Sequence, residues 1–310
     1  MLQLSPRPLT ASAADSRLFV DREDEVRRIE RAVKLRLNTY VAGGPGSGKT
    51  SLLHRAEAAL GRRATFLNAE GATTPEDVAH LVVAAAPETE GATGRPETWP
   101  PVRALRRLPS GPPHAVVLLD GVDDGLRAAL FGRHRDELWE LRVLWVVTGR
   151  SRRLDPPEDA FFTSVIELDD LDEDATIELL RRRAGTGADP DAARVRTLAA
   201  DLAAVLGPTS PRAALGAAGA VLLAEDPDEA LEGLRRHATM AAALPETAQL
   251  VLDAILTLGA VHSGDGRLLD EVGVTRTRVV QLLRDLKAKG LVRTVPRGRR
   301  VLYDLAWRAS

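Results

Sequence analysis

A glycine-rich segment in the first fifth of the chain carries the residue types with the clearest chemistry. It reads G-G-P-G-S-G-K-T over residues 43–50, after an apolar run and before a helix-forming run. Glycines let backbone N–H groups converge on an anion, and the start of a helix adds the positive end of its dipole. A lysine at position 49 can neutralise phosphate oxygens, and a threonine hydroxyl at position 50 can ligate Mg²⁺. The segment predicts a phosphate site formed by Gly43, Gly44, Pro45, Gly46, Ser47, Gly48, Lys49, Thr50 and Ser51.

A carboxylate at the end of a later strand is expected to complete a metal site. Residues 115–119 read A-V-V-L-L and are followed by Asp120. In phosphate-loop proteins a carboxylate at this place holds Mg²⁺ together with the loop hydroxyl, so Thr50 and Asp120 are the predicted metal-side residues. Many such ATPases carry a glutamate at the next position, which polarises the attacking water, whereas this chain has Gly121. Asp123 or Asp124 could supply that carboxylate, so ATP binding is more firmly indicated than hydrolysis, and slow ATPase activity is expected.

The segments that must position these residues alternate between strand and helix patterns. A charged helical stretch covers residues 21–35, and buried strands are predicted at 39–42, 64–67, 115–119, 143–147 and 165–168. Helical patterns lie between them. This alternation is typical of βαβ units, so we predict an α/β fold with a five-stranded parallel sheet covered on both faces. Residues 87–113, rich in Pro, Gly and Thr, are expected to form an irregular insertion around a short helix near 102–108.

The second half of the chain has a different pattern. Helical stretches rich in Ala, Leu and Arg run over residues 174–234, with Asp172 as the expected N-cap of the first. From Pro245 the pattern changes to helices at 247–258, 268–272 and 275–289 and strands at 291–295 and 301–305. The predicted domains are therefore a flexible tail at 1–18, a phosphate-loop core at 19–171, a helical lid at 172–240 and a winged helix-turn-helix at 241–310.

The C-terminal end combines an amphipathic helix with a strongly basic charge. Val279, Leu282, Leu283 and Leu286 follow the i, i+3, i+4, i+7 spacing of a helix with one buried face. Residues 275–310 hold ten basic and two acidic side chains, a local charge of +8 in a chain whose net charge is −2. The pattern favours a helix in the DNA major groove beside a hairpin that contacts phosphates. The candidate DNA contacts are Thr275, Arg276, Thr277, Arg278, Gln281, Arg284, Arg297, Arg299 and Arg300.

The order of these motifs resembles that of the AAA+ ATPases, especially the branch with the origin-recognition initiators and the STAND signalling ATPases. The phrase F-V-D-R-E at 19–23 resembles their F-V-G-R-E box, which implies backbone contacts from Val20 and Arg22 to adenine. The phrase W-V-V-T-G-R at 145–150 resembles the sensor-1 strand, which implies that Thr148 and Arg150 respond to the γ-phosphate. The phrase G-P-T-S-P-R-A-A-L at 207–215 resembles the start of the last lid helix, which implies a sensor-2 role for Arg212.

The resemblance also implies a catalytic set and a mode of assembly. Arg152 and Arg153 fall where such ATPases often carry an arginine finger for a neighbouring subunit, so a homo-oligomer formed with ATP is expected. The catalytic set implied by the motifs together is Lys49, Asp120, Asp123, Thr148, Arg150 and Arg212.

Three functions fit this combination of motifs. The first is an ATP-controlled switch, in which ATP and Mg²⁺ set the arrangement of the lid and the winged helix and promote assembly on double-stranded DNA. The second is a STAND-type signalling ATPase whose winged helix is regulatory and whose partner is a protein. The third, suggested by Gly121, is a DNA-binding regulator with a nucleotide site that is structural. The arginines of the predicted wing favour the first.

Composition excludes several other classes of protein. The chain of 310 residues has no cysteine, which excludes disulfides, thiolate zinc sites, iron–sulfur clusters and cysteine nucleophiles. Its six histidines show no paired metal-ligand spacing. Prolines and polar residues near the N-terminus do not form the apolar core of a signal peptide, and no apolar run reaches the ~20 residues that span a bilayer. We therefore expect a cytoplasmic protein with no membrane contact.

Overall fold

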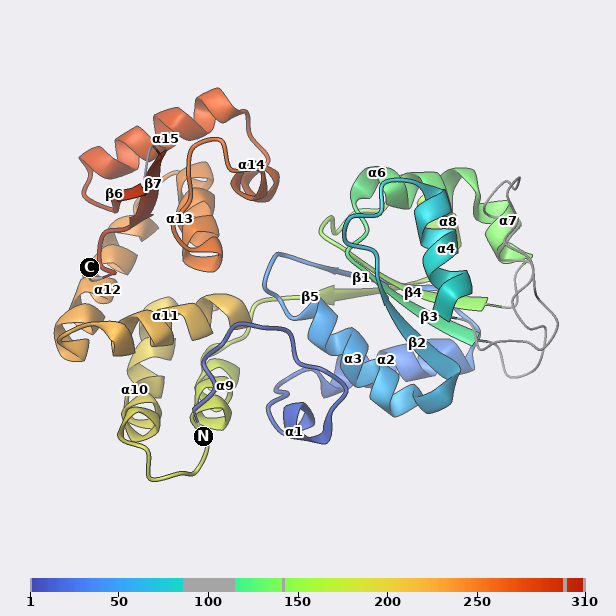
Figure 1. The fold of residues 1–310 in the computed structure, drawn as a ribbon, viewed down its shortest axis with the longest axis horizontal. Coiled ribbons are helices and arrows are strands. Elements are labelled where there is room, and N and C mark those ends of the chain that lie inside the picture. Colours follow the sequence, from blue (N-terminus) through green and yellow to red (C-terminus); the bar gives the residue numbers. More distant parts are fainter. Residues whose placement is uncertain (1, 86–114, 141–142, 298–299, 309–310) are drawn as a thin grey trace. The chain divides into compact units, whose positions relative to one another are not determined.

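The chain folds into two compact units, shown in Figure 1. The computed structural model describes residues 2–85, 115–140, 143–297 and 300–308, and for residues 83, 115, 270 and 300 it describes the backbone alone. Residues Pro8–Asp169 form the first unit, here called the α/β unit. The second, here called the helical unit, contains Met1–Arg7 and Asp170–Ser310. The insertion predicted at 87–113, with its short helix, lies outside the described residues.

A five-stranded parallel sheet forms the centre of the α/β unit. Its strand order is β2-β3-β4-β1-β5. The strands are β1 (Thr39–Gly43), β2 (Ala64–Asn68), β3 (Ala115–Asp120), β4 (Val143–Gly149) and β5 (Ser164–Leu168). All five lie where the sequence predicted strands, and the predicted α/β class with a parallel sheet is confirmed. Because the strands are parallel, their carboxyl ends meet at one edge, which is where open α/β sheets bind ligands.

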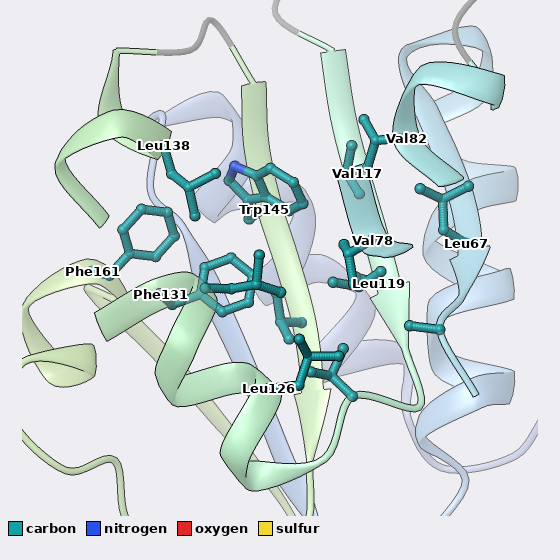
Figure 2. Packing of buried hydrophobic residues seen from close by; sticks show 14 of the residues in the cluster. Leu67, Val78, Val82, Val117, Leu119, Leu126, Phe131, Leu138, Trp145 and Phe161 are labelled. Carbon is teal, nitrogen blue, oxygen red and sulfur yellow. The ribbon is translucent and has the colours of Figure 1, made fainter. Parts of the chain in front are cut away.

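Helices cover both faces of this sheet, as the buried strands require. One face packs against α2 (Glu23–Lys34) and α3 (Lys49–Leu60), and the other against helices on the far side. Those are α4 (Pro75–Ala85), α6 (Asp124–Arg127), the π-type helix η3 (Ala128–Arg133), α7 (Arg135–Trp139) and α8 (Glu158–Phe161). Figure 2 shows this second core, in which Phe131 and Trp145 pack edge to face with centroids 5.5 Å apart. The remaining described elements of the unit are α1 (Ala13–Ser16) and the 3₁₀ turn η1 (Gly61–Arg63).

The N-terminal segment is packed, which corrects the prediction of a flexible tail at 1–18. Leu9 is 5% exposed and belongs to the core between the sheet, α2 and α3. Its backbone N–H donates to the Ser51 Oγ at 2.9 Å. In the helical unit, the backbone N–H of Gln3 donates to the carbonyl of Arg183 at 2.8 Å. The burial of one residue, Leu9, leaves no periodic pattern, so the sequence carried no signal for this docking.

Four helices make up the first part of the helical unit. They are α9 (Glu173–Ala184), α10 (Pro190–Leu206), α11 (Pro211–Leu223) and α12 (Pro227–Ala242). The predicted N-cap of α9 is confirmed, because the Asp172 side chain accepts the N–H of Ala175. At the start of α11 the Ser210 hydroxyl accepts the N–H of Ala213, a cap that was not predicted. Helix α12 runs past residue 240, so the predicted boundary between lid and C-terminal domain falls inside a helix.

Three helices and a hairpin follow, here called the C-terminal module (residues 245–308). They are α13 (Glu246–Leu258), α14 (Gly266–Val272), α15 (Arg276–Ala288) and the antiparallel strands β6 (Val292–Arg297) and β7 (Arg300–Leu305). Each helix and strand lies within two residues of its predicted bounds. Val251, Ile255, Val279, Leu283 and Leu305 are buried in its core. Over the described ranges, no helix has the length and apolar character needed to cross a membrane.

Candidate nucleotide site

The loop between β1 and α3 has a backbone that glycine alone adopts without strain. Gly46 and Gly48 have φ values of 79° and 98°, in the left-handed region that side chains disfavour. At Gly43 the limit is space, because a Cβ there would lie 2.7 Å from the Ser47 Oγ and 3.1 Å from the Leu168 Cβ. The G-x-x-x-x-G-K-T spacing therefore follows from local geometry, and the loop curls back on itself at the carboxyl edge of the sheet.

Polar groups of this loop face inward at the start of α3. The Lys49 Nζ donates to the carbonyls of Gly43 and Gly44 at 2.7 and 2.8 Å. The Ser47 side chain is 3% exposed, and its Oγ has no hydrogen-bond partner among the described residues. Gly48, the N-cap of α3, provides no side-chain acceptor for the first N–H groups of the helix. A buried hydroxyl, uncapped N–H groups and an ammonium in one loop fit a polyphosphate.

Side chains from α3, β3 and β4 meet at one carboxylate. The Asp120 side chain, at the end of β3, accepts the Thr50 hydroxyl at 2.6 Å through Oδ2. It accepts the Thr148 hydroxyl, near the end of β4, at 2.5 Å through Oδ1. Asp120 and Thr148 are 9% and 2% exposed. The structure thus brings together the side chains of Thr50, Asp120 and Thr148, and the hydroxyl and carboxylate predicted to hold the metal are hydrogen-bonded to each other.

The position after Asp120 cannot hold a side chain without rearrangement. Gly121 has a φ of 75°, and a Cβ there would lie 3.0 Å from both the Asn68 Oδ1 and the Glu70 backbone nitrogen. The predicted substitutes have other contacts. The Asp123 Oδ1 accepts the N–H of Leu126 at 2.8 Å and caps α6. The Asp124 carboxylate instead pairs with Arg127.

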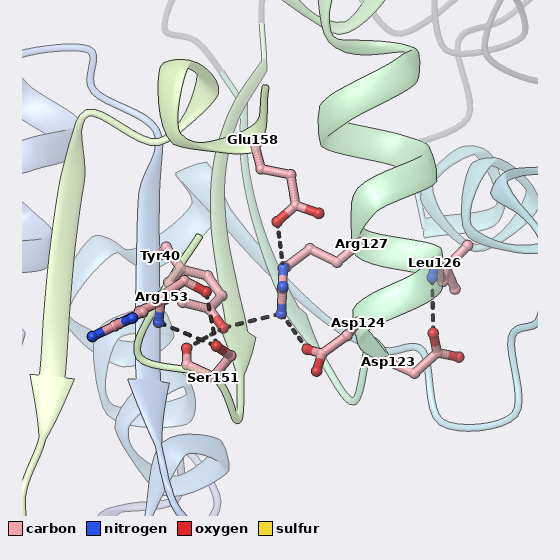
Figure 3. A network of polar contacts seen from close by, with 8 residues as sticks. All are labelled: Tyr40, Asp123, Asp124, Leu126, Arg127, Ser151, Arg153 and Glu158. Atoms are coloured by element: carbon pink, nitrogen blue, oxygen red, sulfur yellow. Dashed lines mark hydrogen bonds and ion pairs between the residues drawn. The ribbon is translucent and has the colours of Figure 1, made fainter. Parts of the chain in front are cut away.

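A buried polar network lies behind the site and was not predicted from the sequence (Figure 3). The Tyr40 hydroxyl, on β1, donates to the Ser151 carbonyl at 2.8 Å and accepts from the Arg127 Nη1 at 3.1 Å. The Arg127 Nε donates to the Glu158 Oε2 at 2.9 Å. A Cβ at Gly149 would lie 2.8 Å from the Tyr40 ring, so the strand end that follows Thr148 packs on this tyrosine.

Burial governs the electrostatics of the network. Burial raises the pKa of Tyr40 to about 12, although the positive charge of Arg127 acts in the opposite direction. Burial alone would lower the pKa of Arg127, but its hydrogen bond to Glu158 and the neighbouring Tyr40, Glu158 and Asp124 raise the pKa overall. Tyr40 therefore remains a neutral donor, and Arg127 remains charged. The sequence signal for this network was limited to a tyrosine and an arginine next to apolar runs. Their partners are distant in the chain, so the network could not be predicted from neighbouring residues.

The F-V-D-R-E segment forms the turn into α2. Asp21 has a φ of 53°, a left-handed conformation that explains why glycine is usual at this place of the resembling box. The Arg22 Nη1 lies 3.3 Å from the Glu25 Oε1, and its Nη2 donates to the carbonyl of Asp169. Val20 is half-buried. The turn is thus tied to the end of β5, on the same edge of the sheet as the phosphate loop.

The predicted arginines have different surroundings. Arg152 pairs with Glu167 at 3.3 Å and with Asp169 at 2.6 Å, so its guanidinium is held within its own chain. Arg150 and Arg153 are exposed. Arg212 lies in the first turn of α11, in the helical unit. The site described within the α/β unit therefore does not include it.

Helix α15 presents the predicted cationic face to solvent. Its apolar stripe of Val279, Leu282, Leu283 and Leu286 is buried. The exposed residues include the predicted DNA contacts Thr275, Arg276, Thr277, Arg278, Gln281 and Arg284. Arg297, at the end of β6, is also exposed. Arg299 lies outside the described residues, as does the side chain of Arg300.

The similarity of this chain to known proteins lies in its structure. The sequence matches no known protein-family model and no curated protein. A Walker-type ATPase of Pyrococcus abyssi is similar in structure, with 17% identity, 98% of this chain and 97% of that chain covered, and a TM-score of 0.54. The Orc1 protein of Aeropyrum pernix in complex with DNA has 24% identity, coverage of 93% and 90%, and a TM-score of 0.42. The RuvB Holliday junction branch migration motor of Thermotoga maritima has 17% identity, coverage of 97% and 96%, and a TM-score of 0.48.

These similarities concern the fold. The five-stranded parallel sheet with its covering helices has the architecture of a Walker-type ATPase, as the motifs predicted. The chain therefore shares the fold of this Walker-type ATPase.

Proposed function

We propose that this chain binds and slowly hydrolyses ATP with Mg²⁺, and that its nucleotide state controls the binding of double-stranded DNA by the C-terminal module. The convergence of the Thr50 and Thr148 hydroxyls on the two oxygens of Asp120 carries the proposal. This contact joins the end of the phosphate loop, the proposed metal-side carboxylate and a hydroxyl from β4. Packing of the sheet alone does not require these three groups to meet.

In the proposed site each residue has a separate task. The loop N–H groups and Lys49 bind the phosphates, and the Ser47 hydroxyl is placed to donate to one of them. Thr50 and Asp120 would hold Mg²⁺, which supplies charge neutralisation to the β- and γ-phosphate oxygens. Thr148 contacts Asp120 from β4 and so links this carboxylate to the segment that carries Arg150.

Nucleotide titration by calorimetry tests the first half of the proposal. Wild type should bind ATP in the presence of Mg²⁺, and Lys49→Ala should bind it about 10- to 100-fold more weakly, since hydrogen bonds to charged groups contribute about 1.5–3 kcal/mol. Lys34→Ala, which removes the same charge from an exposed position on α2, is the control and should bind as wild type does. Equal affinity of Lys49→Ala and wild type would refute the assignment.

The exposed face of α15 supports the DNA-binding half. Three arginines and a glutamine project from a helix whose opposite side is buried, after a turn in which Gly273 has a φ of 69°. The pairing of a basic helix with an antiparallel hairpin fits a winged helix-turn-helix, in which side chains near the helix start read base edges. Arg297 at the hairpin is placed to contact phosphates.

Electrophoretic shift assays at several salt concentrations test this half. Wild type should bind duplex DNA at low salt, more tightly with ATP and Mg²⁺, and its affinity should fall steeply as salt rises. Removing two phosphate contacts with Arg278→Ala/Arg284→Ala should lower the salt slope by about 0.9 per contact. Arg62→Ala, an exposed arginine of the α/β unit, should leave it unchanged. No shift at low salt with ATP and Mg²⁺ would refute DNA binding.

Assembly and lid response form the finer part of the proposal. Arg212, on α11, would report the γ-phosphate to the lid, Arg150 would respond to the same phosphate, and Arg153, the exposed finger candidate, would act on the site of a neighbouring copy. Sedimentation with and without ATP, Mg²⁺ and duplex DNA should show a larger species when all three are present. An unchanged sedimentation coefficient under every condition would refute nucleotide-dependent assembly.

A second candidate function is a signalling ATPase whose C-terminal module is regulatory and whose partner is a protein. Its supporting observation is the packing of the module on α12: the His237 Nε2 lies 3.1 Å from the Leu291 carbonyl oxygen. A Cβ on Gly233 would lie 3.4 Å from the Trp307 Cβ, so the backbones also approach closely. Under this alternative, nucleotide binding is retained and DNA affinity is absent.

A further inference from the structure

The proposed hydrolysis needs a carboxylate that orients the attacking water. The usual position of this carboxylate, directly after Asp120, is occupied by Gly121. At Gly121, any Cβ would lie 3.0 Å from two atoms of the β2 end, the Asn68 Oδ1 and the Glu70 nitrogen, in a left-handed backbone. The chain therefore has to take this carboxylate from elsewhere. The atoms that fill the space identify where to look, because one belongs to the last residue of β2 and the other to the segment directly after it.

The register of the sheet places this segment beside Asp120. Asn68 is the parallel partner of Asp120, and the Ala69 N–H donates to the Asp120 carbonyl at 2.8 Å. Glu70 comes next and lies beside Gly121, with its Cα 3.4 Å from the position of a Cβ on that glycine. Glu70 is thus the first acidic residue after β2, the strand that pairs with β3 and places Asn68 opposite Asp120.

The side chain of Asn68 fixes the backbone at this point. Its Oδ1 accepts the N–H of Glu70 at 2.8 Å, which closes a short turn directly after β2. The Glu70 side chain is exposed, and none of the described residues forms a hydrogen bond or ion pair with its carboxylate. The backbone of Glu70 is therefore held, while its carboxylate is available to a ligand at the carboxyl edge of the sheet.

Other nearby carboxylates are committed to structure. Asp123 caps α6 through the N–H of Leu126. Asp124 is paired with the buried Arg127 at 2.5 Å. Protonation would remove the negative charge that strengthens each of these interactions, whereas Glu70 has no such interaction with a described residue to weaken.

We propose that Glu70 is the catalytic carboxylate of the site and replaces the side chain that Gly121 lacks. This inference rests on the proposed ATPase function. In the step, the water oxygen forms a bond to the γ-phosphorus while the bond from that phosphorus to the β,γ-bridging oxygen breaks. The products are ADP and inorganic phosphate. The Glu70 carboxylate accepts the proton that the water loses and returns it to solvent.

The test compares Glu70→Gln with Glu76→Gln, which removes the same charge from an exposed position on α4. In single-turnover hydrolysis, Glu70→Gln should be slower by about 10²- to 10⁴-fold, the usual contribution of a general base. Glu76→Gln should keep the wild-type rate. Equal rates for Glu70→Gln and wild type would overturn the inference.

A binding measurement gives a second readout that does not depend on turnover. A carboxylate next to the γ-phosphate repels it, so Glu70→Gln should bind a non-hydrolysable ATP analogue about three- to tenfold more tightly than wild type and ADP equally well. A merely structural role for Glu70 predicts the same change, or none, for both nucleotides, and that result would overturn the inference.

The two measurements also separate this inference from the proposed function. If wild type binds no nucleotide, the proposed function fails and the role of Glu70 fails with it. If wild type binds and hydrolyses ATP and Glu70→Gln does so at the same rate, the ATPase proposal stands and the role of Glu70 alone is refuted.

Discussion

The buried pair of Arg127 and Glu158 provides the sharpest test of the packing behind the site. Their side chains are 5% and 3% exposed, and the Arg127 guanidinium also donates to the Tyr40 hydroxyl. Arg127→Met would leave the Glu158 charge buried without its cation and the Tyr40 oxygen without that donor. Removing one partner of a buried pair costs about 3–5 kcal/mol, a large part of the about 5–15 kcal/mol that stabilises a typical domain. We expect a loss of that size.

Urea unfolding followed by the fluorescence of buried Trp145 would measure this loss in the α/β unit. Asp124→Asn is the matched control, because it removes the other carboxylate on the same guanidinium from a side chain that is 64% exposed. Exposed pairs contribute about 0–1 kcal/mol, so this variant should unfold close to wild type. The double variant Arg127→Met/Glu158→Met should recover stability over Arg127→Met, since no buried charge is left unpaired. Equal destabilisation by Arg127→Met and Asp124→Asn would refute this account.

Three further predictions concern stability. Gly121→Ala should destabilise the α/β unit by about 1–3 kcal/mol in urea unfolding, because the backbone there is left-handed and a Cβ would be crowded. Gly44→Ala is the control and should have a smaller effect, because nothing lies within 4 Å of its Cβ. Leu9→Ala should destabilise the α/β unit by about 2–5 kcal/mol, because the Leu9 side chain is buried in its core, and an unchanged stability would contradict this docking. Burial lowers the pKa of His237, so the unfolded chain binds more protons at mildly acidic pH and the stability of the helical unit should fall as pH drops through about 6.5; His237→Gln should flatten this dependence between pH 8 and pH 5.

The sequence predicted best those features that depend on neighbouring residues. The phosphate loop was identified because Gly46, Gly48 and Lys49 are close in sequence, and the left-handed backbone requires glycine at fixed spacing. The five strands followed from continuous aliphatic runs, which a sheet buried on both faces requires. Asp120 and Thr148 were each identified near the end of a predicted strand, but their contact depends on β3 and β4 being neighbours in the sheet, which the sequence did not predict.

Features that depend on distant contacts were missed. Tyr40, Arg127 and Glu158 are far apart in sequence, and nothing local distinguishes them from surface residues or from a tyrosine in a strand. Leu9 was assigned to a flexible tail because burial of one residue leaves no periodic pattern. The crowding at Gly121 depends on the register between β2 and β3, which no composition or spacing specifies.

The carboxylate of Asp120 already has a hydroxyl donor on each oxygen. Each carboxylate oxygen has a second lone pair, so a metal ion or one of its water ligands can bind without displacing either hydroxyl. The two hydroxyls instead hold the plane of the carboxylate in one orientation. Thr50→Ser keeps this restraint, whereas Thr50→Val removes it together with a proposed metal ligand. The Asp120 carboxylate is thus oriented before any ion arrives, and an entering ion does not have to order it.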